Sequence, residues 1–125
     1  MNFQIKANDV FNDASYLIGK KFTLKINETN IDAVITKNSI EKNLRWDNWF
    51  DKRCYSIMNM PDLIKNSNHI GSNYVTKNNF SDKQWVRKQK IKAYHFFVSK
   101  NGMFQFDIEE RWDGQITVYN IKVLK

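Results

Sequence analysis

The sequence predicts an α+β fold in which an antiparallel sheet of about five strands packs with two or three helices. Near residue 20 the spacing of apolar residues changes from a helical period to a period of two. Further on, Asn101-Gly102 and Asp113-Gly114 are strong hairpin signals separated by ten residues. These observations predict an N-terminal hairpin and a C-terminal three-stranded meander, with helices over the apolar face. A length of 125 residues fits a single domain, 1–125.

The first segment is expected to form a helix and then the N-terminal hairpin. Asn8 suits the N-cap of the helix and Gly19 suits its C′ position. The apolar stripe between them consists of Val10, Phe11, Ala14, Leu17 and Ile18. The alternating segment that follows is interrupted by the turn sequence NETN, so the two strands present Phe22, Leu24 and Ile26, then Ile31, Ala33 and Ile35.

The middle of the chain predicts a second helix, a long irregular stretch and a short helix. The spacing of aromatic and apolar residues from Ser39 to about Met58 indicates an aromatic-rich helix that stops near Pro61. The stretch from Asn59 to Phe80 contains six Asn, one Gly and the only Pro, which favours irregular chain. Ser81 then opens a capping box with a helix over 81–88.

The two C-terminal turns fix the strand register if each is a two-residue type I′ loop. The first turn then pairs Phe97 with Phe106, and the second pairs Phe106 with Ile121. One face of the meander becomes apolar and gathers Phe97, Phe104, Phe106, Ile108, Tyr119, Ile121 and Val123. The opposite face carries Tyr94, Phe96, Val98, Gln105, Asp107, Glu109, Ile116, Val118, Asn120 and Lys122, together with Lys88, Lys90, Lys92, Lys100 and Arg111.

Composition favours a cytoplasmic protein with an anionic partner. Twenty Lys and Arg against thirteen Asp and Glu give a formal net charge of +7. A single Cys54, a charged N-terminus and the absence of a long apolar run argue against secretion and against a membrane partner. His69, His95 and Cys54 lack zinc spacing, and no GxGxxG, Walker or GxSxG motif occurs, so we expect no metal and no cofactor.

A polar group enters the apolar face of the meander near the Asp113-Gly114 turn. The type I′ register makes His95, Glu110, Trp112, Thr117 and Tyr119 neighbours there. A Glu beside a His is what a small metal-independent ribonuclease needs, with one group taking the 2′-OH proton and the other protonating the leaving oxygen. The alternative is structural: His95 is a satisfied core histidine, and Glu110 lies in water at a fraying strand end.

The opposite face of the meander combines cations with aromatic rings, which is typical of a platform for nucleic-acid stacking. Its candidate binding residues are Lys88, Lys90, Lys92, Tyr94, Phe96 and Arg111. Asp107 and Glu109 lie at its centre and repel phosphates, so the alternative is a half-covered face packed under a helix or a second subunit.

The aromatic segment between Arg45 and Cys54 is a second candidate surface. It interleaves Arg45 and Arg53 with Trp46 and Trp49, which suits a nucleotide held by stacking and charge, although an aromatic stripe at helical spacing more often belongs to the core. Trp112 joins the candidates because an exposed tryptophan marks a binding surface.

The leading hypothesis is a small basic, non-enzymatic binding protein that recognises a nucleic acid, a nucleotide or a nucleoprotein complex. Its size and its Asn-, Lys- and Ile-rich composition, typical of AT-rich genomes, suggest a phage- or plasmid-encoded inhibitor of a host enzyme or defence system. Two alternatives stay open. One is the ribonuclease with His95 and Glu110. The other is a protein-protein interaction module of immunity or antitoxin type, with a homodimer as one form.

Overall fold

The computed structural model describes residues 3–76 and 81–125 and confirms the α+β class. Within these residues six strands form one sheet in the order β1-β2-β6-β5-β4-β3, antiparallel except between β2 and β6. The strands are β1 (Lys21–Ile26), β2 (Thr29–Val34), β3 (Ser67–Tyr74), β4 (Ile91–Ser99), β5 (Phe104–Arg111) and β6 (Ile116–Val123). The helices are α1 (Phe3–Ala14), the 3-10 helix η1 (Ser15–Leu17), α2 (Lys37–Glu41), α3 (Phe50–Met58), α4 (Met60–Lys65) and α5 (Asp82–Lys88).

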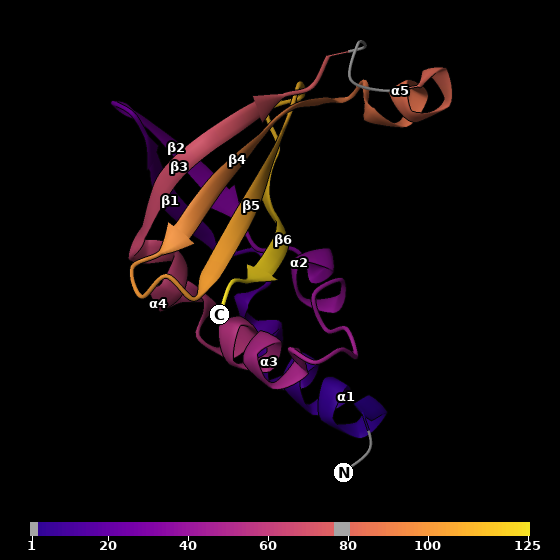
Figure 1. Cartoon of the computed structure of the whole chain (residues 1–125), viewed down its shortest axis with the longest axis vertical. Coiled ribbons are helices and arrows are strands. Elements are labelled where there is room, and N and C mark those ends of the chain that lie inside the picture. The colour runs from indigo at the N-terminus through magenta and orange to yellow at the C-terminus, as the bar shows by residue number, and fades with distance from the viewer. Residues whose placement is uncertain (1–2, 77–80) are drawn as a thin grey trace.

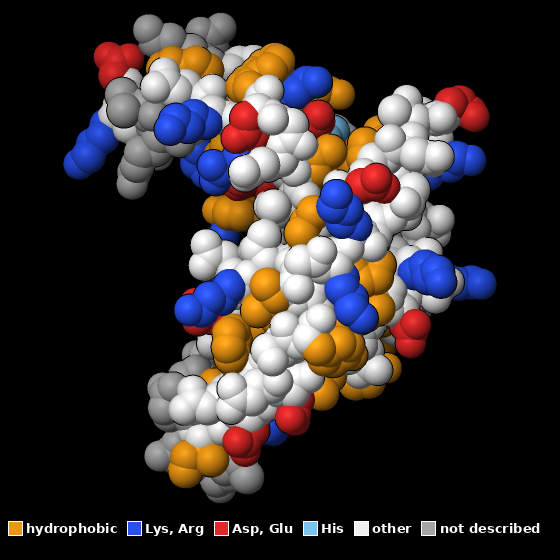
Figure 2. Space-filling model, turned by 180° about the vertical axis from the view of Figure 1, so that it is seen from behind, with side chains coloured by type: hydrophobic (Ala, Val, Ile, Leu, Met, Phe, Trp, Pro, Cys, Tyr) orange, Lys and Arg blue, Asp and Glu red, His pale blue; other side chains and the backbone are white. Residues whose placement is uncertain are grey.

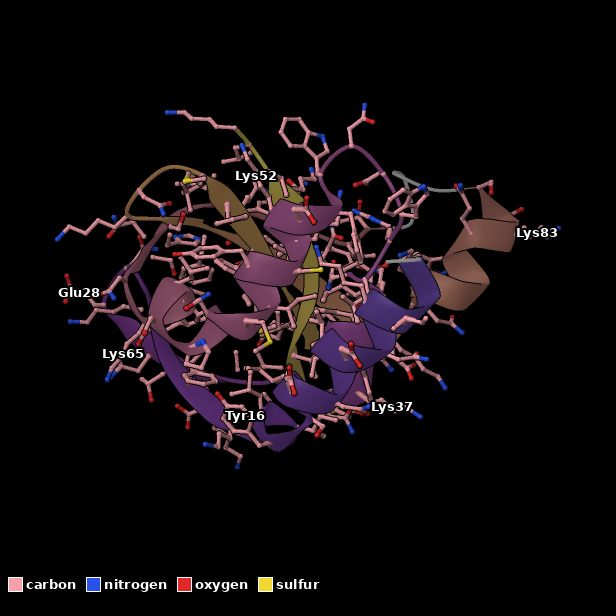
Figure 3. The ribbon with its side chains drawn as sticks, turned by 90° about the horizontal axis from the view of Figure 1, so that it is seen from below. Tyr16, Glu28, Lys37, Lys52, Lys65 and Lys83 are labelled. Atoms are coloured by element: carbon pink, nitrogen blue, oxygen red, sulfur yellow. The ribbon has the colours of Figure 1, made fainter. Side chains whose placement is uncertain are left out.

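The sheet is curled, because β1 and β3, at opposite ends of the strand order, contact each other. The helices α1, α3 and α4 gather at one end of the sheet, whereas α5 lies at the other end (Figure 1). Seen from below, α1 and α3 lie across the end of the curled sheet (Figure 3). The largest fully buried side chains fill the space between helices and sheet: Leu17, Ile35, Ile40, Ile57, Met60, Ile64, Phe97, Phe104, Phe106, Ile108, Val118 and Ile121.

The N-terminal hairpin is confirmed, and its two strands are joined by Asn27 and Glu28, with Asn27 at φ +54°. The preceding helix also forms, and Gly19 adopts φ +89° just after it. The predicted start of this helix is wrong: α1 begins at Phe3, so Asn8 lies inside it. Buried Ala7 extends the apolar stripe by one turn before Val10, which accounts for the earlier start.

The single helix predicted from Ser39 to about Met58 is wrong, because the structure contains two helices separated by residues 42–49. The side chain of Asp47 accepts a hydrogen bond from the N–H of Trp49 at 2.9 Å, and this local turn precedes α3. The capping box at Ser81 and the helix that follows it are confirmed.

The irregular stretch predicted for 59–80 is wrong over most of its length, since α4 and β3 occupy residues 60–65 and 67–74. β3 forms the edge of the sheet beside β4 and makes the sheet six-stranded. Its sequence SNHIGSNY lacks a clear alternation because a β-bulge between His69 and Gly71 interrupts the pairing with β4. Residues 77–80 of the predicted loop lie outside the described residues.

The turn type predicted for the C-terminal meander is wrong, although the first register is confirmed. Phe97 lies opposite Phe106 as predicted. Gly102 and Gly114 have positive φ, but among described non-glycine residues only Asn27 does, so neither turn is type I′. In the second hairpin the N–H of Arg111 donates to the carbonyl of Gln115 at 2.9 Å, which makes a three-residue loop.

The longer second loop shifts the register of β6 by one residue near the turn. Ile108 pairs with Val118 instead of Tyr119, and a β-bulge then restores the predicted pairing of Phe106 with Ile121. Val118 is therefore buried in the core, and Ile116 packs against it, whereas both were predicted on the opposite face. Tyr119 moves the other way, to the face that carries Tyr94.

Side chains from the helical segment cover the outer edge of β6. β2 pairs with β6 at one position only, Val34 with Thr117. Beyond this point Ser39 donates to the carbonyl of Val118 at 2.6 Å, and the N–H of Ile121 donates to the side chain of Asn43 at 2.9 Å. Arg53 completes the edge by donating to the carbonyl of Ile121 at 3.0 Å. These bonds explain why three polar side chains are buried there.

Candidate functional site

A concave notch lies on the outer face of β5 and β6, beside α2. A cavity of about 280 Å³ lies there. Its lining residues come from the α2 segment and from the last two strands: Thr36, Asn38, Lys42, Glu109, Arg111, Gln115, Thr117, Val118 and Tyr119. A second cavity of about 520 Å³ adjoins it and shares Thr36, Gln115 and Thr117. Both flank the single pairing between β2 and β6, where the two strands separate.

Two lysines from different elements approach the ring of Tyr119, and of these Lys42 lines the cavity whereas Lys88 lies beside it. The Nζ of Lys42, just after α2, lies 3.0 Å from the centroid of the Tyr119 ring, and the Nζ of Lys88, at the end of α5, lies 5.9 Å from it. Lys88 also donates to the hydroxyl of Tyr94 at 3.1 Å. Within the described part of the chain, neither ammonium has a carboxylate within 4.0 Å.

A third cation and one carboxylate complete the charges of the notch. Arg111 donates to Glu109 at 2.9 Å, and this bond raises the pKa of the Arg111 guanidinium. Burial, followed by the Glu109 carboxylate, raises the pKa of Tyr94 far above its ordinary value, so the phenol stays neutral. The charged lining residues Lys42, Arg111 and Glu109 sum to +1, and Lys88 beside them adds one further positive charge.

The β-bulge in β6 creates this notch, because it turns Tyr119 out of the core. The Tyr119 ring then lies against the Tyr94 ring, with centroids 5.3 Å apart and an angle of 48° between the planes. The two carboxylates that were expected to repel phosphates, Asp107 and Glu109, both have hydrogen-bond partners. Asp107 is buried and accepts hydrogen bonds from Gln105 at 2.8 Å and Asn120 at 3.3 Å, while Glu109 is bound to Arg111.

The remaining predicted platform residues divide between two places. Phe96 is half-buried on the outer face, and Lys90 is exposed at the start of β4. Lys92 does not join them, because a β-bulge between Ile91 and Ala93 directs its ammonium to Glu110, at 3.7 Å, and over the Trp112 ring, at 5.4 Å. Trp112 itself is 67% exposed.

The predicted aromatic surface around α3 is only partly available to a ligand. Arg53 is buried, and its guanidinium is bound to Asp47 and to the carbonyl of Ile121. It therefore holds the edge of β6 in place and is not available to a ligand. Arg45 is exposed. Trp46, which contacts Phe50 edge-on at 5.4 Å, and Trp49 are also exposed.

The predicted contact between His95 and Glu110 is present on the inner face. Nε2 of His95 lies 2.9 Å from a carboxylate oxygen of Glu110, and the His95 side chain is buried. Two of its other predicted neighbours, Thr117 and Tyr119, lie on the opposite face because of the register shift in β6. Ser72 and His69 take their place: Ser72 Oγ lies 2.6 Å from Nδ1 of His95 and 2.9 Å from Nε2 of His69.

Sequence reasoning did not identify Lys42, His69 or Ser72 as site residues. Lys42 follows a helix too short to show a periodic stripe, and its partner ring depends on a bulge. His69 and Ser72 were placed in an irregular loop. The sequence feature that could have indicated this bulged strand is Gly71, since an isolated glycine within a strand often marks a bulge.

Positive charge is otherwise spread over the molecule. The labelled side chains of Lys37, Lys65 and Lys83 come from three helices and point outward (Figure 3), and Lys52 in α3 donates to the carbonyl of Lys125. Lys and Arg side chains are likewise scattered over the side seen in Figure 2, where the outline is indented beside the lobe that carries α5. Net charge alone therefore does not locate a site, whereas the convergence of Lys42 and Lys88 does.

Two further kinds of site are absent from the described residues. No group of three or more His, Cys, Asp or Glu side chains is arranged there to hold a metal ion. No helix in the described ranges is long and apolar enough to cross a membrane.

Comparison with known proteins gives no further guide to function. No protein-family model matches the sequence, and neither a curated protein nor a solved structure is significantly similar to the chain.

Proposed function

We propose that the protein is a binding protein that holds a phosphate group of a nucleotide or of a nucleic-acid strand in the notch beside α2. The convergence of Lys42 and Lys88 on the Tyr119 ring carries this proposal. The two ammonium groups lie 3.0 and 5.9 Å from the same ring centroid, so both contribute positive potential to an anion bound beside that ring. Arg111 contributes a planar donor that suits a phosphate oxygen.

The surroundings of the two lysines support an anionic ligand of this kind. Tyr119 and Tyr94 hold the ammonium groups by cation–π contact and by a hydrogen bond, so little side-chain entropy is lost on binding. Asn38 and Thr117 line the same cavity and offer an amide and a hydroxyl donor to the remaining phosphate oxygens.

Fluorescence anisotropy with labelled oligonucleotides tests the proposal. Single-stranded DNA, single-stranded RNA and duplexes of about 20 residues are titrated at about 50 mM and about 200 mM salt, with ATP and inorganic phosphate as competitors. Binding to one strand type that ATP does not displace would identify a nucleic acid, and displacement by ATP would identify a nucleotide. No affinity for any of these ligands at the lower salt concentration would refute the proposal.

Matched variants locate the site. Lys42→Ala and Lys88→Ala are each expected to weaken binding about tenfold, since each removes one direct phosphate contact. Lys37→Ala in α2 and Lys83→Ala in α5 lower the net charge equally but lie outside the notch, and we expect less than a twofold change. Equal effects of all four substitutions would assign the binding to bulk charge.

The alternative ribonuclease mechanism is less well supported by the geometry of the inner face. His95 and Glu110 are hydrogen-bonded to each other at 2.9 Å, whereas a base and an acid that act on one phosphodiester must each reach a different oxygen of the substrate. Incubation with labelled RNA in the presence of a chelator tests this alternative, and cleavage that His95→Ala abolishes would support it.

The protein-interaction alternative rests on exposed aromatic side chains. Trp46 is 69% exposed, and Trp112 has a similar exposure. Such rings are common anchors in interfaces. The roles of inhibitor, immunity protein or antitoxin, and a homodimeric state, stay predictions from composition and size.

A further inference from the structure

The inner face holds a continuous chain of hydrogen bonds that the proposed binding function does not use. It runs from His69 through Ser72 and His95 to Glu110, with spacings of 2.9, 2.6 and 2.9 Å. Lys92 lies 3.7 Å from the second carboxylate oxygen of Glu110. The four members of the chain come from three neighbouring strands, β3, β4 and β5.

The direction of the protons along this chain follows from the donors and acceptors available. An ionised Glu110 accepts, so Nε2 of His95 donates to it. In the neutral imidazole Nδ1 then carries no proton and accepts the hydroxyl proton of Ser72. The lone pairs of Ser72 Oγ are left to accept from Nε2–H of His69. Ser72 is thereby a hydroxyl whose proton already points at a base, and a carboxylate orients that base.

The backbone of β3 is shaped to bring these groups together. Residues 69 and 72 are an odd number apart and would lie on opposite faces of a regular strand, but the β-bulge between His69 and Gly71 places both on the inner face. Val75 donates to the carbonyl of Lys92 at 3.0 Å, which fixes the alternation of the antiparallel pair. The N–H of Ser72 therefore points away from β4.

We propose that Ser72, His95 and Glu110 form a nucleophile–base–carboxylate triad that hydrolyses a carboxylic ester. Ser72 Oγ attacks the ester carbonyl while its proton passes to Nδ1 of His95, and the ester C–O bond breaks as that proton is delivered to the leaving alcohol. Water then attacks the acyl-serine, His95 takes its proton, and the acid is released as Ser72 regains a proton. The outward N–H of Ser72 is placed to bind the oxyanion.

The base of the chain is its buried member, and the serine and the carboxylate on either side of it are partly exposed. His95 is buried, so the base is shielded from water, whereas the Glu110 side chain is 21% exposed. Ser72 is half-buried on the edge strand, and its neighbour Tyr74 is 59% exposed.

A fluorophosphonate ester is the probe for an activated serine. Its reaction joins Ser72 Oγ to phosphorus and releases fluoride, while the hydroxyl proton passes to His95. Intact mass and peptide mapping of the labelled full-length protein should show one adduct, on Ser72. Ser72→Ala should abolish it, and Glu110→Gln should slow labelling about 100-fold, within the range of general-base catalysis.

Ser67→Ala is the matched control, because Ser67 lies on the same strand but donates to the carbonyl of Ile64. It should label at the rate of the wild-type protein. Thermal unfolding of each variant establishes that it is folded, and Glu110→Asp separates lost chemistry from lost folding, since it keeps the carboxylate and should restore part of the rate.

Three results would overturn the proposal: no adduct on the folded wild-type protein, an adduct on another residue, or a Glu110→Gln variant that labels as fast as the wild type. None of these results depends on nucleic-acid binding, because the triad and the notch lie on opposite faces of the sheet.

Discussion

The ammonium of Lys42 lies 3.0 Å from the centroid of the Tyr119 ring, although the two residues are separated by most of the chain. The contact joins the segment after α2 to the bulged residue of β6. A cation over a ring face is positioned without being neutralised, and it keeps its charge for a ligand. The notch is therefore a site at which the ring orients the cation.

Replacing Tyr119 by Leu should weaken binding of the anionic ligand about tenfold, because Lys42 and Lys88 lose the ring that positions them. Equilibrium titration of the folded variant measures this change. Tyr16→Leu is the control, since Tyr16 also lies under a lysine, Lys20, at 5.0 Å, but outside the notch. If both variants bind as the wild type does, the ring does not contribute to the site.

The salt dependence of binding should report how many lysines contact phosphate. For a single-stranded nucleic acid, loss of one phosphate contact reduces the slope of log K against log salt by about 0.7. Lys42→Ala and Lys88→Ala should each show this reduction, measured over a series of salt concentrations. An unchanged slope in both variants would mean that neither ammonium contacts a phosphate.

Asn43→Ala should lower the free energy of unfolding by about 1 to 3 kcal/mol, because it leaves the buried N–H of Ile121 without an acceptor. Urea denaturation measures the loss. Asn59→Ala is the control: its side chain makes the same bond to the carbonyl four residues earlier, but in an exposed position. A similar loss of unfolding free energy in both variants would assign the effect to the bond between the Asn side chain and the carbonyl four residues earlier.

Asp47 should make stability depend on acid pH. Its hydrogen bond with Arg53 holds the pKa of Asp47 below the ordinary value of 3.8. A lowered folded pKa stabilises the fold above the ordinary pKa, and this stabilisation is lost as the pH falls through the folded pKa. Asp47→Asn should therefore cost about 1 kcal/mol at pH 7, a value that allows for partial exposure, and progressively less below about pH 4.

Denaturation curves at several pH values check this expectation. The difference in unfolding free energy between the wild type and Asp47→Asn should shrink as the solution becomes more acidic. A difference that stays constant down to the lowest accessible pH would show that the carboxylate charge does not contribute.

Gly114→Ala should destabilise the second C-terminal hairpin by about 1 kcal/mol, because Gly114 has φ +93° and alanine adopts that conformation only with strain. Gly71→Ala is the control, since Gly71 has no such φ and an added Cβ meets no atom within 4 Å at either position. Thermal unfolding compares the two. Equal destabilisation would exclude backbone strain as the cause.

Local sequence patterns predicted those elements that depend on neighbouring residues. The alternation of Phe22 and Leu24 indicated the first hairpin correctly, whereas α1 ends at Ala14 and a 3-10 helix separates it from Gly19. The Asn101-Gly102 turn gave the right register on β4 and β5 in spite of the wrong turn type. That register was enough to place His95 beside Glu110.

The parts that could not be predicted depend on one-residue insertions in strands. A bulge reverses the face of every residue up to the next irregularity, so Val118 and Tyr119 exchanged faces although the pattern ITVYNIKV looks regular. The bulge beside Gly71 similarly concealed β3, and with it the contact of Ser72 with His95. Lys42 enters the notch only through tertiary packing of α2 against β6.

Amide chemical shifts during a titration test the phosphate-binding notch most directly. The wild-type protein, labelled with ¹⁵N, is titrated with the tightest-binding phosphate ligand from the anisotropy series at low salt. We expect the largest shifts at residues 36–42, 109–111 and 117–119 and at the end of α5, and much smaller shifts in α1 and α3. Shifts concentrated in α1 and α3, or absent at saturating ligand, would contradict a phosphate-binding notch.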